Sequence, residues 1–280
     1  MQAFAEFSGQ GPEFWAHVKL VSERLGYSQR VKKGEPKKLK RFTFDEVLVC
    51  LRTLGLESRV VDEATGDPTE TGKLLVGYLN YRAEQLETVV EPALMDREAA
   101  RTEFERLREE LRPTCILPMN KQKGDKQHHS FLVGIVNMLT DHELGERTFN
   151  ADPRGLTVAT ENNAPLRTFS RWMDGAYPDV IDPHAVWEVK EYYGTKTFGS
   201  RVADGVYETM LDGYEFAELN EHEGRRVLHY LIVDDHFTWW DCGRSYLCRI
   251  VDMLHLGLVD EVLFGREVLT RWPQIVATWP

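Results

Sequence analysis

The sequence predicts a mixed α/β protein: a central mixed sheet flanked by helices, preceded by a helical N-terminal region. Over most of the first 117 residues, apolar residues recur with helical spacing. After about residue 166 the pattern changes to the short apolar runs and alternation of strands, with helical segments between them. Apolar residues make up 42% of the 280 residues, which is enough for a substantial core.

The N-terminal region contains three helical signals. Residues 14–25 have amphipathic spacing, and Thr43–Glu46 is a capping box ahead of an apolar run. Residues 74–111 are rich in helix formers, and Pro92 is expected to break or kink this long helix. The polar stretch 118–127 reads as a boundary, which divides the chain into a helical part, 1–117, and a second domain, 118–280.

The second domain is expected to run helix, strand, strand, strand, helix, strand, with two further helices at the end. The predicted helices are residues 128–144, 199–219, 244–257 and 260–272. The predicted strands are residues 167–173, 176–181, 185–193 and 226–235, with 237–241 as a candidate partner for the last. Asp174-Gly175 and Asp182-Pro183 are read as the turns between the first three strands.

Charge limits the classes of partner. The formal net charge of -11 argues against a surface that binds nucleic acid everywhere. Residues 1–60 nevertheless carry 11 basic and 7 acidic side chains, and seven of the basic ones lie in residues 30–41. This segment is either a solvated loop or an arm that contacts phosphates.

The compartment is expected to be the cytoplasm. No run of about 18 apolar residues predicts a membrane span. The first residues lack the basic start and apolar segment of a secretory signal. The four cysteines form no Cys-x-x-Cys pair, which favours a reducing environment.

Charged residues inside two predicted strands are the main functional lead. Glu188 and Lys190 lie two residues apart and therefore on one face of the strand 185–193. Asp179 lies in the preceding strand, across the short Asp-Pro turn. Buried charges of this kind cost several kcal/mol unless a partner or a metal compensates them.

This set of groups fits a metal site. Two carboxylates and a backbone carbonyl form the oxygen-rich environment that Mg2+ prefers, with Mn2+ as a substitute. Such an ion stabilises charge on an attacked phosphate and generates hydroxide from bound water, which a nearby lysine can orient. The expected chemistry is hydrolysis of a phosphodiester.

The spacing resembles a known motif. Pro178-Asp179, eight residues and then Glu188-Val189-Lys190 resemble the motif of the PD-(D/E)xK nuclease superfamily, over roughly residues 128–240. The resemblance implies a restriction-endonuclease-like core. It also implies that Asp179 and Glu188 bind Mg2+ with the Val189 carbonyl, and that Lys190 serves the attacking water. Members often add a glutamate from the first helix, for which Glu143 and Glu146 are the candidates.

The resulting hypothesis is a Mg2+-dependent DNA endonuclease of restriction or phage-defence type. It is expected to act on duplex DNA as a homodimer, because two strands need two sites, with the N-terminal helices serving recognition or dimerisation. The residues expected to contact nucleic acid are Lys37, Lys38, Lys123, Lys126, Lys196 and Arg201. The alternatives are a structure-selective or RNA-directed nuclease, or a non-catalytic nucleic-acid-binding or assembly subunit in which Glu188 and Lys190 form only an ion pair.

Overall fold

The protein is a mixed α/β structure. A computed structural model describes residues 1–32, 34–63, 66–119, 128–193 and 199–280. Its main sheet has the order β3-β4-β5-β6, in which β3 is antiparallel to β4 and the other neighbours are parallel. These strands are β3 (Gly175–Tyr177), β4 (Ala185–Glu191), β5 (Leu228–Asp234) and β6 (Glu261–Phe264). The expectation of a mixed sheet flanked by helices is therefore confirmed.

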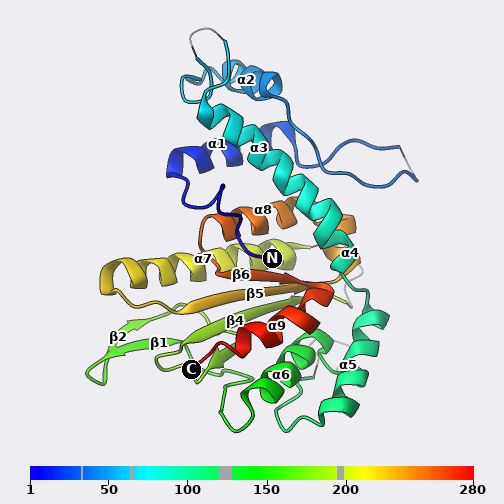
Figure 1. Ribbon diagram of the computed structural model, residues 1–280, viewed down its shortest axis with the longest axis vertical. Coiled ribbons are helices and arrows are strands. Elements are labelled where there is room, and N and C mark those ends of the chain that lie inside the picture. The colour runs from blue at the N-terminus through cyan, green and yellow to red at the C-terminus, as the bar shows by residue number, and fades with distance from the viewer. Residues whose placement is uncertain (33, 64–65, 120–127, 194–198) are drawn as a thin grey trace.

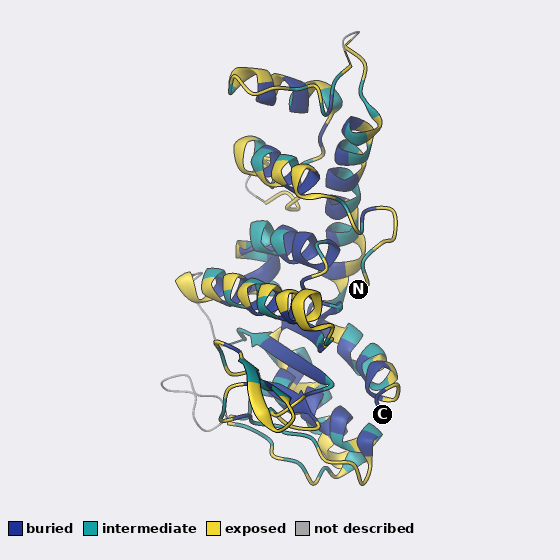
Figure 2. Cartoon of the chain, turned by 90° about the vertical axis from the view of Figure 1, so that its left-hand side faces the viewer, coloured by how far each residue is buried: buried dark blue, intermediate teal, exposed yellow. Residues whose placement is uncertain are grey.

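Helices cover both faces of this sheet (Figure 1). One face packs against α7 (Ser200–Glu223) and α8 (Arg244–His255), and the other against α6 (Phe131–Leu144) and α9 (Val268–Val276). Trp187 and Val189 join the core on the α6 side, whereas Val186 packs with residues of α7. Figure 2 shows the strands of this sheet buried between the two helical layers.

The N-terminal region is helical, and it leads into the sheet through one long helical run. α1 (Pro12–Leu25), α2 (Phe44–Thr53) and α3 (Glu70–Gln85) share one core. The capping box at Thr43 is present as predicted, because its side chain accepts from the Glu46 N–H and the Glu46 carboxylate accepts from the Thr43 N–H. Among the described residues, no helix is both long enough and apolar enough to cross a bilayer.

The run beginning at α3 breaks close to Pro92, as expected. A π-helical turn, Leu86–Val90, and α4 (Glu91–Ala93) continue it past Pro92, and the extended backbone of Leu94 ends it. Asp96 then caps α5 (Arg97–Leu111), and Phe104 and Leu107 of α5 join the core shared by α6 and the sheet.

Several predicted strands differ from the structure. Residues 237–241 form a π-helical turn, Phe237–Cys242, and residues 261–264 of a predicted helix form β6. Short apolar runs such as these do not distinguish helix from strand, and the position beside β5 decides. Residues 167–173 form no single strand: β2 (Ala164–Thr168) pairs with β1 (Val158–Glu161), and this hairpin turns at Asn162-Asn163 with positive φ.

The predicted turn at Asp174-Gly175 is not a turn. Gly175 opens β3, and β3 ends at Tyr177, before the cis peptide bond to Pro178. The connection from β3 to β4 is therefore the segment 178–184, which contains Asp179 and Asp182. This shift of the hairpin by a few residues changes which acid lies beside Glu188.

Candidate functional site

Asp174 lies beside the charged end of β4. The register pairs Gly175 with Trp187, so that Asp174 lies next to Glu188 at the start of β3. The Asp174 N–H donates to the Trp187 carbonyl at 3.1 Å, and the Val189 N–H donates to the Asp174 carboxylate at 2.8 Å. These bonds fix the Asp174 carboxyl group at the edge of β4.

Asp179, the acid predicted for this position, lies at the other end of the hairpin. It is exposed, and its carboxylate accepts from the Asn150 side-chain amide and from the Val180 N–H, each at 2.7 Å. The reason is the antiparallel pairing: the start of the first strand lies beside the end of the second. An acid close to the turn therefore cannot meet Glu188 and Lys190, whereas one at the start of β3 does.

Glu188 and Lys190 form an ion pair on the α7 side of the sheet. Glu188 is only 1% exposed, and one of its oxygens, Oε2, accepts from the Lys190 ammonium. Burial alone lowers the pKa of Lys190, but the carboxylates of Glu188 and Asp174 raise it above its ordinary value. The second oxygen, Glu188 Oε1, is buried and has no hydrogen-bond partner.

Two residues that the sequence analysis missed extend this cluster. Arg171 Nη1 lies 2.8 Å from Asp212 Oδ2 and 3.9 Å from Glu188 Oε1. Its Nη2 lies 2.9 Å from Glu208 Oε2. Asp212 is on α7 and fully buried, and its Oδ1 has no hydrogen-bond partner. In the sequence, an acid facing inward in the middle of a helix that packs on the sheet was the available signal.

Burial and repulsion between the carboxylates raise the pKa values of Asp174 and Asp212. Burial, followed by the charge of Glu188, raises the pKa of Asp174 to about 6. Burial raises the pKa of Asp212 to about 7, although the guanidinium of Arg171 opposes the shift. The cluster therefore holds more carboxyl groups than its two cations, Lys190 and Arg171, can fully stabilise as anions.

The other predicted ligands divide into two groups. Val189 is at the site, and because its N–H points to the edge that carries Asp174, its carbonyl points the same way. Glu143 lies in the last turn of α6 and Glu146 beyond its end. The N-terminus of α6 contacts Glu191 at the end of β4, so that the other end of this helix, with Glu143, lies away from the cluster.

The predicted nucleic-acid contacts are only partly described. Lys123, Lys126 and Lys196 lie outside the described residues. Lys38 and Arg201 are exposed, and Arg201 is in the first turn of α7. The Lys37 ammonium contacts Asp241 in the turn that follows β5, at 2.8 Å from its carbonyl and 3.0 Å from its carboxylate. This contact fixes part of the basic segment against the sheet-containing half of the molecule.

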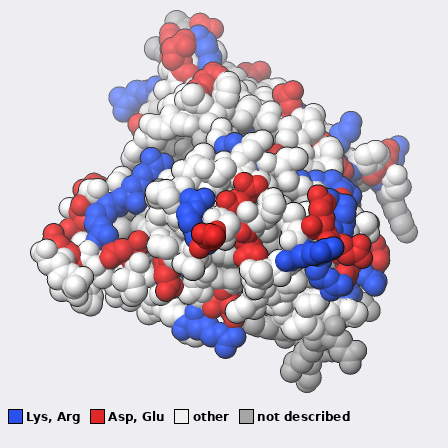
Figure 3. All heavy atoms as spheres, turned by 60° about the horizontal axis from the view of Figure 1, so that its bottom comes forward, with Lys and Arg blue, Asp and Glu red and all other residues white. Residues whose placement is uncertain are grey.

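Surface charge is mixed. On the face drawn in Figure 3, lysine and arginine side chains are interspersed with aspartate and glutamate. Many of the described basic groups also form surface ion pairs, such as Arg106 with Glu110 and Arg167 with Glu218. A basic groove for duplex DNA therefore remains a prediction.

The cluster carries oxygen atoms of the kind that a hard divalent cation prefers. Within the described part of the chain, no three His, Cys, Asp or Glu side chains are grouped as a complete metal site. Asp174 and Glu188 with the Val189 carbonyl offer three oxygens, and waters usually complete the coordination of Mg2+. The unpartnered Glu188 Oε1 is the group that such an ion would satisfy.

Comparison with known proteins places the chain in a family. The sequence model described as Domain of unknown function (DUF7687) matches residues 95–279. The chain belongs to the DUF7687 family. A second model, Domain of unknown function (DUF7690), matches residues 1–89. No curated protein and no solved structure matches the chain.

The DUF7687 segment contains the whole sheet and every residue of the cluster around Asp174. It begins at residue 95, just after the extended Leu94, and so includes α5. The sequence analysis set its boundary later, between residues 117 and 118. The DUF7690 segment contains α1 to α3 and the basic stretch 30–41.

Proposed function

We propose that this protein is a Mg2+-dependent nuclease, with the candidate site built from Asp174, Glu188 and Lys190. The observation that carries the proposal is the meeting of these three side chains at one end of the β3–β4 hairpin. It corrects the expected motif in one position, with Asp174 in place of Asp179. Glu188, the Val189 carbonyl and Lys190 keep the roles that the PD-(D/E)xK resemblance implies.

The fold supports the restriction-endonuclease-like part of the proposal. α6, β3, β4, α7 and β5 follow one another in the expected order. Asn150 pairs with Ala176 on the outer side of β3, where a first strand of such a core would lie. The β1–β2 hairpin is then an insertion between this position and β3. Restriction or phage defence as the biological setting rests on the resemblance.

Each residue has a defined task in the proposed reaction. Asp174, Glu188 and the Val189 carbonyl would hold the ion, which would act as a Lewis acid on the phosphate. Lys190 donates a hydrogen bond to the attacking water and neutralises charge beside it. Arg171 contacts Asp212 and lies near Glu188, and its positive charge offsets the repulsion between the two carboxylates before the ion binds.

The test compares two aspartates on the same hairpin. Purified protein is incubated with plasmid, linear duplex, single-stranded DNA and RNA, in Mg2+, Mn2+ or EDTA. We expect Mg2+-dependent cleavage that falls by about 100-fold or more in Asp174→Asn, Glu188→Gln and Lys190→Ala. Asp179→Asn, the matched control, is expected to keep wild-type activity within about threefold, because its contacts lie at the other end of the hairpin.

The outcomes separate the alternatives. Equal cleavage by wild type and all variants would indicate a contaminant. Loss of activity in Asp179→Asn with retention in Asp174→Asn would overturn the corrected site. Binding of nucleic acid without cleavage under any of these conditions would favour the non-catalytic subunit, in which Glu188 and Lys190 form only an ion pair.

A further inference from the structure

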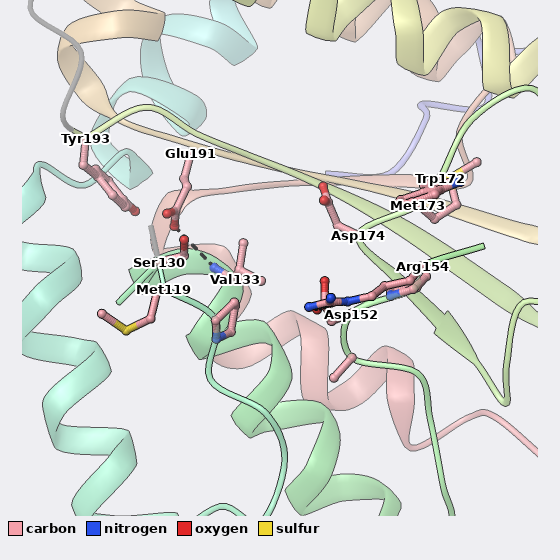
Figure 4. Close-up of a pocket in the computed structure, with 13 residues that line it drawn as sticks. Met119, Ser130, Val133, Asp152, Arg154, Trp172, Met173, Asp174, Glu191 and Tyr193 are labelled. Carbon is pink, nitrogen blue, oxygen red and sulfur yellow. Dashed lines mark hydrogen bonds and ion pairs between the residues drawn. The ribbon is translucent and has the colours of Figure 1, made fainter. Parts of the chain in front are cut away.

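A cavity opens beside the candidate site on the opposite, α6, side of the sheet edge. It has a volume of about 510 Å³, which is in the range of small-ligand pockets. Asp174 lines it, so that the proposed catalytic cluster and the cavity share this residue. In Figure 4, Asp174 and Glu191 lie along the cavity, between Trp172 at one end and Tyr193 at the other.

Trp172 is an unusual feature of this cavity. It is 56% exposed, whereas none of the other six tryptophans is more than 3% exposed. A large aromatic ring left in water at the rim of a pocket has an unused face for stacking. Nothing within the described part of the chain buries this ring, and it lies two residues from Asp174.

The backbone around Trp172 is anchored on both sides. Arg171 is held by Asp212, Met173 is buried in the core beside α7, and Asp174 accepts from Val189. The ring is therefore presented from a fixed position rather than from a free loop. A preorganised aromatic group loses little conformational freedom when a ligand stacks on it.

The rest of the cavity offers both apolar and polar surface. Met119 and Val133 supply apolar contacts. Arg154, whose guanidinium lies 2.8 Å from Asp152, is mostly exposed and can meet a phosphate. The Glu191 carboxylate accepts from the Leu132 N–H at the start of α6 and offers further acceptor capacity toward the cavity.

We propose that this cavity receives the base of one unpaired nucleotide, stacked on Trp172, next to the phosphodiester presented to Asp174. This inference rests on the proposed nuclease function and names its substrate class: a strand with an unpaired nucleotide at the cleavage position. A base inside an intact duplex is stacked on both faces and shows only its edges in the grooves, so filling such a pocket first costs the free energy of unstacking and unpairing. Single strands, frayed ends and bulges avoid most of this cost, and the pocket therefore favours them.

The experiment uses Trp172 as its own probe. Intrinsic tryptophan fluorescence is measured in EDTA while a mixed-sequence single-stranded DNA, the same sequence in RNA, or a covalently closed dumbbell duplex without ends is added. Because Trp172 is the exposed tryptophan, stacking is expected to quench the emission with the single strands and not with the dumbbell. Trp172→Phe is expected to abolish the quenching and to keep affinity within about threefold, measured by anisotropy of labelled strands. Trp172→Ala is expected to weaken single-strand binding about tenfold or more.

The results distinguish the two proposals. Quenching by single strands without cleavage in Mg2+ would support the pocket and contradict the nuclease. Cleavage of duplex DNA without quenching, and with Trp172→Ala fully active, would overturn the pocket and leave the nuclease intact. Equal quenching by the dumbbell and by single strands would also overturn the pocket. A response to DNA but not RNA, or the reverse, identifies the sugar that the pocket accepts.

Discussion

Arg171 illustrates how single residues balance the charges of this site. Its guanidinium joins the carboxylates of Asp212, Glu208 and Glu188, which come from α7 and β4. Asp212 is fully buried, and burial raises its pKa to about 7 even with this guanidinium present. The arginine therefore matters most when Asp212 is ionised.

We predict that Arg171→Gln destabilises the protein more at pH 8 than at pH 5. Without the guanidinium the pKa of Asp212 rises further, so at pH 5 the acid is protonated and needs no cation, whereas at pH 8 its ionisation is penalised. The expected loss at pH 8 is about 2 to 4 kcal/mol in the free energy of unfolding. Urea unfolding at both pH values, without metal, measures it.

The double variant Arg171→Gln/Asp212→Asn is the control for this prediction. It removes both members of the pair, so most of the extra loss at pH 8 should disappear. A loss of equal size at the two pH values would show that Arg171 acts through packing and not through its charge.

At the scale of residues, the sequence predicted the Glu188–Lys190 pair on β4 but not Asp174, the acid beside it. Two-residue spacing placed Glu188 and Lys190 on one face, and they do form a pair. The sequence points to Asp179 because Pro-Asp precedes the pair at the spacing of the motif, whereas Asp174-Gly175 resembles a turn. The pairing of β3 with β4 depends on where the hairpin turns, and sequence spacing alone does not fix that register.

At the scale of elements, Gly175 determines how closely β3 approaches β4. A Cβ atom there would lie 2.0–2.3 Å from ring atoms of the fully buried Trp187. We predict that Gly175→Ala costs about 1 to 3 kcal/mol and displaces Asp174 from Val189, because the indole is packed and cannot yield. Thermal unfolding measures the first effect, and the cleavage assay the second.

Gly155→Ala is the matched control for that substitution. A Cβ at Gly155 would meet only Val180 Cγ2 at 4.0 Å, which is ordinary contact, and its φ is not positive. Its stability should stay within about 0.5 kcal/mol of wild type. If both alanine variants behave alike, close packing at Gly175 does not position the hairpin.

Asp234 ties three segments together at the end of β5. Its Oδ1 accepts from the Met95 N–H at 2.7 Å, and its Oδ2 accepts from the Tyr193 hydroxyl. Burial raises its pKa to about 7, against an ordinary value of 3.8. Between these pH values the unfolded chain has released the proton and the folded chain has not, so this group lowers stability as pH rises through the window.

We predict that Asp234→Asn gains stability relative to wild type as pH rises from 5 to 8. The amide keeps an acceptor for the Met95 N–H but cannot ionise. Comparing the two proteins at each pH removes the contributions of all other groups, including His229, whose burial lowers its pKa to about 4 and gives the opposite slope. A difference that stays constant between pH 5 and pH 8 would contradict the assignment.

The elements that could be predicted are those with strong periodicity or caps. The helices around 14–25, 44–53 and 200–223 and the strands β4 and β5 follow the sequence pattern. β6 could not be predicted, because the run Glu261–Phe264 is short and mostly apolar and becomes a strand only through pairing with β5. The π-helical turn at 237–242 buries Trp239 and Trp240 in one core, whereas a strand would have separated them.

At the scale of the whole molecule, a buried ion pair joins the N-terminal helices to the sheet-containing half. Arg82 of α3 contacts both carboxylate oxygens of Asp252 on α8, at 2.7 and 2.8 Å. Tyr78 donates to the same carboxylate at 2.6 Å, and Arg82 also donates to Ser22 at 2.9 Å. Every side chain of this network is buried. The DUF7690 and DUF7687 segments are therefore joined by a desolvated polar network.

We predict that Arg82→Met destabilises the protein by about 3 to 5 kcal/mol, because it leaves the Asp252 carboxylate buried without a cation. The loss should uncouple the two segments, so that unfolding of α1–α3 precedes that of the sheet. Hydrogen exchange resolved by segment measures this: in wild type α3 and β5 should exchange together, and in the variant α3 should exchange first.

Arg52→Met, which breaks a more exposed ion pair with Asp62 in the same N-terminal region, should cost less than about 1 kcal/mol and leave exchange coupled. Arg82→Met/Asp252→Leu replaces the pair with apolar groups and should recover most of the loss. Exchange that remains coupled in Arg82→Met would mean that other contacts, and not this ion pair, join the two segments.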